Sequence, residues 1–184
     1  EDPAMSAGSA EAAVRAAGAG VAAVDAVMAG EGPQAFCAVR PPGHHATREV
    51  AMGFCLFNSV AVAAAHAVHA HGLHRVAIAD FDVHHGNGSQ DIFAGDPRVM
   101  YLSSHQSPLY PNTGDPAEQG MGNLANATLA PLEAEDYRWL SAELAALAGR
   151  HAGGRLVSLL EGGYSLSALR ACSVAHLQGL LDAR

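Results

Sequence analysis

Two carboxylates and an imidazole recur at every second position in one short stretch of the chain. Asp80, Asp82 and His84 follow directly on the apolar residues 75–79, which are typical of a buried parallel strand. Since successive side chains of an extended chain alternate between faces, the three groups share one face if the strand conformation continues. An imidazole with oxygen donors suits zinc. The stretch predicts a metal site rather than a charged strand end that caps the next helix, because three ionisable groups together without a cation would repel or stay desolvated.

Two adjacent histidines form a second group that could do chemistry. His44 and His45 follow the predicted strand 35–39 and the rigid sequence Arg-Pro-Pro-Gly at residues 40–43. Ligands of open α/β sheets bind at the carboxyl ends of the strands. The pair therefore predicts general acid–base catalysis beside the metal site, rather than a pair of surface histidines.

A tyrosine follows two glycines at the end of a further apolar run. Glu161-Gly162-Gly163-Tyr164 comes directly after residues 155–160, and the glycines allow the backbone to bend sharply. The bend would bring the Tyr164 hydroxyl over the sheet edge, where it could donate a hydrogen bond to an oxyanion. The alternative is a tyrosine that merely packs over the turn.

Four histidines gather near the end of the predicted helix 58–71. Positions 66 and 69 are neighbours on a helix, so they could hold a second metal ion. A solvated helix face with imidazoles near the helix C-terminus is the interpretation that we favour. The four residues are His66, His69, His71 and His74.

The elements that must position these residues alternate between strands and helices. This alternation predicts an α/β domain with a parallel sheet. The predicted strands are residues 35–39, 75–79, 98–105 and 155–160, and the predicted helices are residues 9–30, 58–71, 89–95, 133–151 and 165–184.

Composition excludes some classes of function. The 184 residues suit one domain, and the net charge of −8 argues against nucleic-acid binding, which would need a basic stripe. Cys37, Cys55 and Cys172 are scattered, which predicts free, mostly buried thiols and a cytoplasmic location. We find no signal peptide and no uninterrupted apolar run long enough to span a bilayer, so no membrane partner is expected. The chain does not begin with Met, which is compatible with an excerpt of a larger domain, and its sequence indicates no oligomeric state.

Five motifs follow one another along the chain: RPPGHHA at residues 40–46, GFCLFN at 53–58, DFDVHHGNG at 80–88, YLSSHQSPLYPNTGD at 101–115 and EGGY at 161–164. Together they resemble the histone deacetylase family, in the form of its class II members and bacterial amidohydrolase relatives, including acetylpolyamine amidohydrolases. The resemblance covers nearly the whole chain. It implies a single, partial domain over residues 1–184, with an arginase/deacetylase-like, three-layer fold in which helices cover both faces of a parallel sheet.

The resemblance implies a role for each matching residue. His44 and His45 match the tandem catalytic histidines, Asp80 matches the carboxylate that orients His44, and Asn87 stands beside His45. Tyr164 matches the tyrosine that polarises the scissile carbonyl. The residues that would line the acyl-lysine channel are Gly53, Phe54 and Tyr110.

The resemblance also implies the cations and the reaction, a zinc-dependent deacetylation of acetyl-lysine or acetylpolyamine without direct nucleic-acid contact. Asp82 and His84 match two zinc ligands, and Gly86 stands where the two-manganese arginases have an Asp, which favours one catalytic metal. Zinc would bind the acetyl carbonyl and a water whose pKa it lowers. A histidine would take the proton of that water, and a histidine would protonate the leaving amine. The implied structural potassium site comprises Asp80, Asp82, His84, Ser103 and Ser104.

The family's third zinc ligand, an Asp at the end of another central strand, has no counterpart in the sequence. Residues 122–130 resemble the segment before it and residues 131–140 the segment after it, so we expect a βα unit of roughly 30 residues to be absent, together with the family's N-terminal portion. Removing a central strand would leave neighbouring strand edges unpaired. Three hypotheses follow: a truncated gene product, a degenerate homologue that at most binds acyl amines, or a substitute ligand. The candidates for that ligand are Asp115, Glu133, Glu135 and Asp136.

Overall fold

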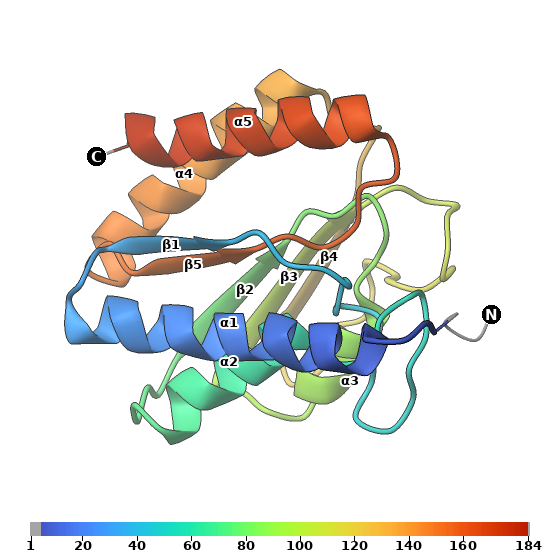
Figure 1. Cartoon of the computed structure of the whole chain (residues 1–184), viewed down its shortest axis with the longest axis horizontal. Helices are drawn as coiled ribbons and strands as arrows, with labels where there is room; N and C mark the ends of the chain where they lie inside the picture. Colours follow the sequence, from blue (N-terminus) through green and yellow to red (C-terminus); the bar gives the residue numbers. More distant parts are fainter. Residues whose placement is uncertain (1–4, 184) are drawn as a thin grey trace.

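Five short strands, all paired in parallel, form the middle layer of the molecule (Figure 1). β1 (Gln34–Cys37) pairs with β5 (Leu156–Leu159). β2 (Val76–Asp80) pairs with β3 (Val99–His105), which pairs in turn with β4 (Leu124–Thr128). Four of these strands were predicted from their apolar runs. β4 was not, because its sequence Leu-Ala-Asn-Ala-Thr contains no such run.

The pairing is interrupted between β5 and β2. Within residues 5–183, which the computed structural model describes, β5 pairs with β1 alone and β2 pairs with β3 alone. Each of the two strands therefore keeps one unpaired edge. The structure confirms the parallel pairing and the unpaired edges that the sequence led us to expect, and it shows two separate sheets in one layer.

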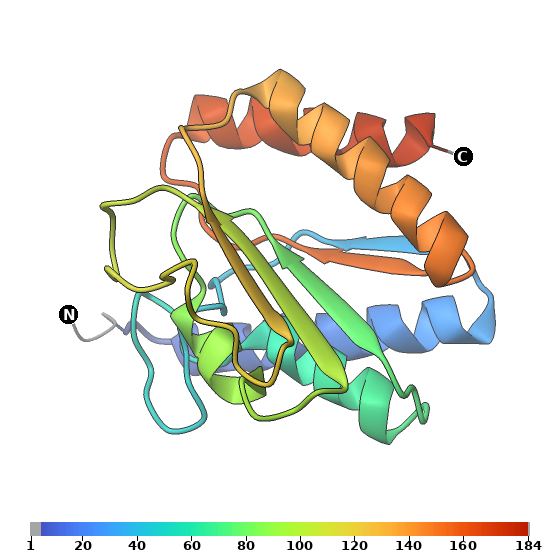
Figure 2. The ribbon, with the colours of Figure 1, turned by 180° about the vertical axis from the view of Figure 1, so that it is seen from behind.

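Helices cover both faces of this layer (Figures 1 and 2). α1 (Ser9–Ala29), α2 (Ser59–His69) and α3 (Asn87–Phe93) lie on one face. α4 (Ala134–His151) and α5 (Leu166–Asp182) lie on the other. The three-layer α/β fold expected from the sequence is confirmed.

The core under the three-stranded sheet fixes the strands that carry the site. Val99 and Tyr101 of β3 are fully buried and pack with Phe93 of α3. Small residues allow α1 to approach α2 closely, since a Cβ on Gly20 would lie 3.1 Å from the Cβ of Ala63. Such close packing leaves the strand ends little freedom to shift.

The length and composition of α1 are those of a helix that could cross a bilayer. It is not an uninterrupted apolar run, because Glu11, Arg15 and Asp25 stand within it. In this fold α1 packs against α2 and β1, with Ala16, Gly20 and Val24 among its buried residues. The apolar composition is therefore also explained by the burial of one face against the middle layer.

Helix starts differ from the sequence predictions by one or two residues. Gly8 takes the N-cap position of α1, and α3 begins at Asn87, two residues before the predicted start. Asn58 caps α2 as predicted, because its Oδ1 accepts a hydrogen bond from the N–H of Ala61 at 3.0 Å. The predicted free thiols are confirmed for Cys37, Cys55 and Cys172.

Candidate active site

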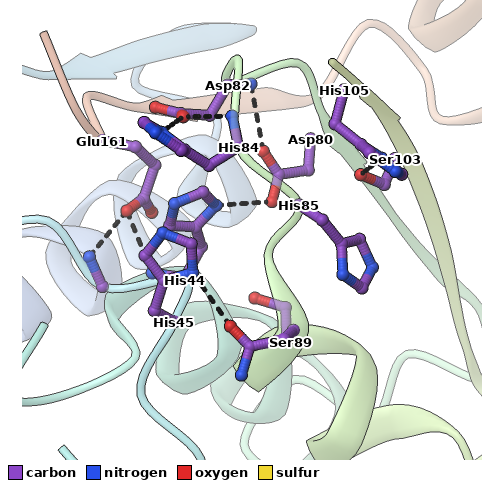
Figure 3. Close-up of polar contacts among 12 residues, drawn as sticks. His44, His45, Asp80, Asp82, His84, His85, Ser89, Ser103, His105 and Glu161 are labelled. Atoms are coloured by element: carbon purple, nitrogen blue, oxygen red, sulfur yellow. Dashed lines mark hydrogen bonds and ion pairs between the residues drawn. The ribbon is translucent and has the colours of Figure 1, made fainter. Parts of the chain in front are cut away.

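The carboxyl ends of β1, β2 and β5 meet at one edge of the middle layer, and polar side chains gather there (Figure 3). The loop after β1 carries His44 and His45, the segment after β2 carries Asp82 and His84, and Glu161 follows β5. Parallel strands bring their ends together even when they are far apart in the sequence. The structure thus places the predicted catalytic and metal-binding groups side by side.

His44 and Asp80 form a buried ion pair. His44 Nδ1 lies 2.9 Å from Asp80 Oδ2, and the Tyr101 hydroxyl donates a hydrogen bond to the same oxygen at 2.9 Å. Burial by itself would lower the pKa of His44, but the charge of Asp80, helped by Glu161 and Asp82, raises this pKa to about 10. His44 is therefore a cation at neutral pH, and its Nδ1–H donates to Asp80.

His45 is held in the opposite protonation state. Its Nδ1 lies 2.9 Å from Oδ1 of Asn87, whose amide nitrogen is turned toward Met52 Sδ at 3.4 Å. Burial and the charge of His44 lower the pKa of His45 to about 4. Because an amide oxygen only accepts, Nδ1 of the neutral ring carries the proton and Nε2 keeps a free lone pair. The centroids of the two rings are 4.0 Å apart. The positively charged His44 therefore lies directly beside the neutral His45, which can accept a proton.

Glu161 ties the histidine loop to the end of β5. Its Oε2 accepts hydrogen bonds from the backbone N–H groups of Gly43 at 2.6 Å and His44 at 3.0 Å. Arg40 donates in turn to the carbonyls of Glu161 at 3.0 Å and Gly162 at 2.9 Å. Burial raises the pKa of Glu161 against the opposing charge of His44. This residue was missed from the sequence, although an acidic residue directly after an apolar strand is a usable signal.

Asp82 and His84 lie side by side, but an extended strand does not position them as we predicted. β2 ends at Asp80, and the chain then turns: Asp80 Oδ1 accepts from Asp82 N at 3.2 Å, and Asp82 Oδ1 accepts from His84 N at 2.9 Å. Such side chain–backbone bonds replace the alternation of an extended chain. Asp82 Oδ2 accepts from Gly162 N at 3.0 Å. Burial would raise the pKa of Asp82, but His84 and the charge of His44 hold it well below its usual range, so the carboxylate is ionised.

The residues described here supply two donors for a zinc ion at this edge. Within residues 5–183, no third His, Cys, Asp or Glu converges on Asp82 and His84. A catalytic zinc normally has three protein ligands, so the site as folded does not fit one. The predicted potassium site gains no support from the described residues, in which the Ser103 hydroxyl is hydrogen-bonded to His105 Nδ1 at 3.0 Å.

The four candidates for a substitute ligand are placed elsewhere. Glu133 and Asp136 form the capping box at the start of α4. Asp115 Oδ1 accepts a hydrogen bond from the N–H of Ala117 at 2.8 Å, and Glu135 is exposed in the first turn of α4. The structure therefore gives the substitute-ligand hypothesis no support.

Aromatic side chains surround the approach to His45. The ring of Tyr110 packs edge-on against His45 with centroids 5.0 Å apart, and Tyr164 lies 6.1 Å from Phe54. Gly53 has a φ of +57°, and a Cβ at this position would collide with the His45 ring. The three predicted channel residues are thus brought together with Tyr164, which is 60% exposed.

Close packing explains the glycine at position 86. A Cβ there would collide with Asp80 Oδ2, and it would lie 2.5 Å from the Tyr101 hydroxyl and 2.9 Å from His44 Nδ1. A carboxylate at this position, which a second metal ion would use, therefore does not fit beside the His44–Asp80 pair.

A second histidine network was missed from the sequence. His85 is buried, with Nδ1 2.8 Å from Thr113 Oγ1 and Nε2 3.1 Å from Gln90 Oε1. These bonds tie the long loop after β3 to α3. The signal in the sequence is the second histidine of the Asp-Val-His-His segment, to which we assigned no role.

The histidines near the end of α2 form a different group from the one considered above. Asp25 Oδ1 of α1 lies 2.6 Å from His66 Nε2 and 2.7 Å from His71 Nε2. His69 is exposed and does not join them. His66 is therefore grouped with His71, which lies beyond the end of α2, and with Asp25 of α1. The spacing of residues along α2 could not indicate either partner.

Comparisons with known proteins agree with this geometry. A family model described as "Histone deacetylase domain" matches residues 1–132. The chain is 37% identical to Histone deacetylase 14, chloroplastic, of Arabidopsis thaliana, over 90% of the chain and 52% of that protein. It is 34% identical to the Histone deacetylase-like amidohydrolase of Pseudomonas aeruginosa, over 100% of the chain and 62% of that protein. The solved HDA15 HD domain superposes with a TM-score of 0.81 at 31% identity, covering 92% of this chain and 63% of that one.

The chain spans about half to three fifths of the length of these relatives. Residues are also lacking inside the matched region. The match to the Pseudomonas protein runs over 234 residues and covers all 184 residues of this chain, so about 50 residues of that protein have no counterpart here. This difference agrees with the internal βα unit that the sequence led us to expect to be absent.

Proposed function

Because the chain belongs to the histone deacetylase family, we propose that it carries the acid–base half of a deacetylase site for acetyl-lysine or acetylpolyamine amides. The observation that carries the proposal is the tandem histidine pair. His44 is charged and held by Asp80, whereas His45 is neutral and held by Asn87. Two adjacent imidazoles with pKa values pushed in opposite directions are typical of an acid–base site.

The proposed division of labour follows from the position of each ring. His45 borders the aromatic approach through Tyr110, so its free Nε2 takes a proton from the attacking water and passes it to the leaving amine. His44 lies behind it as a buried cation and stabilises the negative charge of the tetrahedral intermediate. The Tyr164 hydroxyl donates a hydrogen bond to the same oxyanion.

Asp82 and His84 are the two residues that would hold a zinc ion at this edge of the middle layer. A zinc ion held there would supply polarisation of the carbonyl and a more acidic water. With two protein ligands we expect weak zinc binding. Hydrolysis by this chain alone should then be far slower than hydrolysis by a complete site.

An acyl-amine binding module without turnover is the second candidate function. The two-donor site at Asp82 and His84 favours it, because the aromatic approach and the histidine pair are formed while the metal site is incomplete. The cytoplasmic location and the absence of nucleic-acid and membrane partners stay predictions.

Hydrolysis of an acetyl-lysine peptide and of N-acetylputrescine, at a fixed excess of zinc, tests the proposal. His45→Gln should lower kcat/KM by about 100-fold or more. His69→Gln, at an exposed histidine on α2, should leave kcat/KM unchanged. Binding of either compound with its acetyl group left intact would favour the second function, and neither binding nor turnover would contradict both.

A further inference from the structure

A large apolar cleft separates the two sheets. It has a volume of about 720 Å³ and lies between β5 and β2, and we call it the β5–β2 cleft. Val24 of α1 and Ala63 of α2 line it from one helical layer, and Leu144 and Ala148 of α4 line it from the other. Figure 1 shows that β1 and β5 form one pair of strands and that β2, β3 and β4 form a separate group of strands between the two helical layers.

Strand edges, rather than a sheet face, border this cleft. Residues 75–84 and residues 155–165 line it without a break. A sheet face would contribute every second residue, because side chains alternate between the two faces of a strand. The unpaired backbone edges of β2 and β5 therefore face each other across the cleft.

The hydrogen bonds on the paired side identify the groups that face the cleft. The N–H of Leu156 bonds toward β1, and the N–H of Val76 bonds toward β3. In a parallel strand the direction of bonding alternates from one residue to the next. The N–H and C=O groups directed into the cleft belong to Ala77, Ala79, Val157 and Leu159.

The two ends of the cleft carry opposite charges. Arg75 and Arg155 stand just before β2 and β5 and line the cleft. Among the ion pairs of residues 5–183, neither guanidinium has a carboxylate partner. Asp82 and Glu161 stand at the other end, where the Asp82–Gly162 bond joins the two sheets. A strand that runs in the same sense as β2 and β5 would meet positive charge where it starts.

The connection between β4 and α4 is short, and a relative carries residues within the matched region that this chain lacks. β4 ends at Thr128 and α4 begins at Ala134, so five residues connect the two elements, and the family match ends at residue 132. The Pseudomonas protein has about 50 residues in the matched region without a counterpart here. A strand with its crossover helix needs about 30 residues, so that number suffices for one further strand.

We propose that the β5–β2 cleft binds an extended peptide from another chain as a parallel strand, paired with β2 on one edge and with β5 on the other. Such strand addition uses main-chain hydrogen bonds for affinity. The bound segment is apolar on both faces, because helices cover both sides of the cleft. It carries an acidic residue before its first apolar position, opposite Arg75 and Arg155. The proposal does not depend on the chain being a deacetylase, because pairing requires no hydrolysis.

Overlapping peptides of roughly ten residues that cover the additional residues of the Pseudomonas protein are the probes. Residue-resolved hydrogen exchange of the whole chain is the measurement. Without peptide, the amides of residues 77, 79, 157 and 159 should exchange quickly, while those of residues 76, 78 and 156 stay protected. One peptide, with an acidic residue before an apolar segment, should slow hydrogen exchange at residues 77, 79, 157 and 159 by about tenfold or more. It should leave the exchange rates of residues 76, 78 and 156 unchanged.

A pair of tryptophan variants tests whether the peptide occupies the cleft. Ala148→Trp places a large ring inside it and should abolish the protection, whereas Ala171→Trp, at an exposed position on α5 outside it, should not. Failure of every peptide to protect the wild-type chain would overturn the proposal. Protection of the four amides without peptide, rising with protein concentration, would also overturn it, because a second copy of the chain would then fill the cleft.

Discussion

Asp80 controls the charge of the site although it lies behind the histidines and is buried. Its carboxylate holds His44 as a cation, and that charge in turn helps to keep His45 neutral. The division of the pair into a cation and a base is therefore a property of one carboxylate and its distance of 2.9 Å from His44.

Asp80→Asn should reverse the protonation of His44. The amide oxygen still accepts from Nδ1, but the largest opposing charge is gone, so burial counts for more and the pKa of His44 should fall well below about 10 although Glu161 and Asp82 remain. The pKa of His45 should rise above about 4 because its neighbour loses its charge. Titration of the imidazole resonances by NMR measures both, and an unchanged pKa of His44 would contradict the role of Asp80.

Glu161→Gln tests the bond between the histidine loop and β5. The amide oxygen of the variant can still accept from both backbone N–H groups, but it carries no negative charge, so these two hydrogen bonds and the attraction to the charged His44 are weakened. We expect the free energy of unfolding to fall by about 1–3 kcal/mol, measured by urea denaturation. Glu143→Gln, at an exposed position on α4, should leave it nearly unchanged, and equal effects of the two variants would refute the anchoring role.

At the scale of elements, the buried cap of α2 joins the helix to the histidine loop. Asn58 Oδ1 accepts from Ala61 N, while its Nδ2 donates to the Ala46 carbonyl at 3.0 Å and to Ser89 Oγ at 3.1 Å. Asn58→Ala should lower the free energy of unfolding by about 2 kcal/mol or more. Ser165→Ala, at the exposed cap of α5, should cost clearly less in the same urea titration. A loss as small as that of the Ser165 variant would contradict the linking role.

His176 connects α5 to its neighbours in a way that depends on pH. Its Nδ1 lies 2.6 Å from Ser141 Oγ of α4, and its Nε2 lies 2.7 Å from Ser158 Oγ of β5. Burial lowers the pKa of His176, so the folded chain binds fewer protons there than the unfolded chain. This contribution to stability is fully present above the unfolded pKa of about 6.5 and is lost as the pH falls below it.

Urea denaturation at a series of pH values measures this contribution. Between about pH 7.5 and 5.5 the wild-type chain should lose more stability than His176→Asn, whereas His151→Asn, at an exposed histidine, should follow the wild type. Identical pH dependence in wild type and His176→Asn would show that burial of this imidazole does not couple to folding.

How much of the fold and the site could be predicted from the sequence depended on which interactions fix each residue. Strand ends that follow apolar runs meet at one edge by topology, so the positions of His44, Asp82 and Tyr164 could be predicted. The turn after Asp80 could not, because it results from side chain–backbone bonds that compete with an extended chain. Long-range partners such as Glu161 for the histidine loop, and the group of Asp25 with His66, depend on packing between elements distant in the sequence.

At the scale of the whole molecule, two sheets lie in one layer and the site is divided between them. The histidine loop and Glu161 belong to β1 and β5, whereas Asp80, Asp82 and His84 belong to the end of β2. The Asp82–Gly162 bond joins the two groups at the carboxyl end, and the β5–β2 cleft separates the strands behind it. The acid–base groups are complete because their partners, Asp80 at the end of β2 and Asn87 at the start of α3, are both in place. Only two donors, Asp82 and His84, meet at the metal site of the described residues.

Zinc content per chain tests most directly the claim that the acid–base half is formed while the metal half is incomplete. Asp25→Asn should be used as the background, because the surface group of Asp25, His66 and His71 could retain zinc by itself. After dialysis against a weak chelator, elemental analysis should find clearly less than one zinc per chain. A value near one that is lost in His84→Ala would contradict the account, since a third ligand would then complete the site.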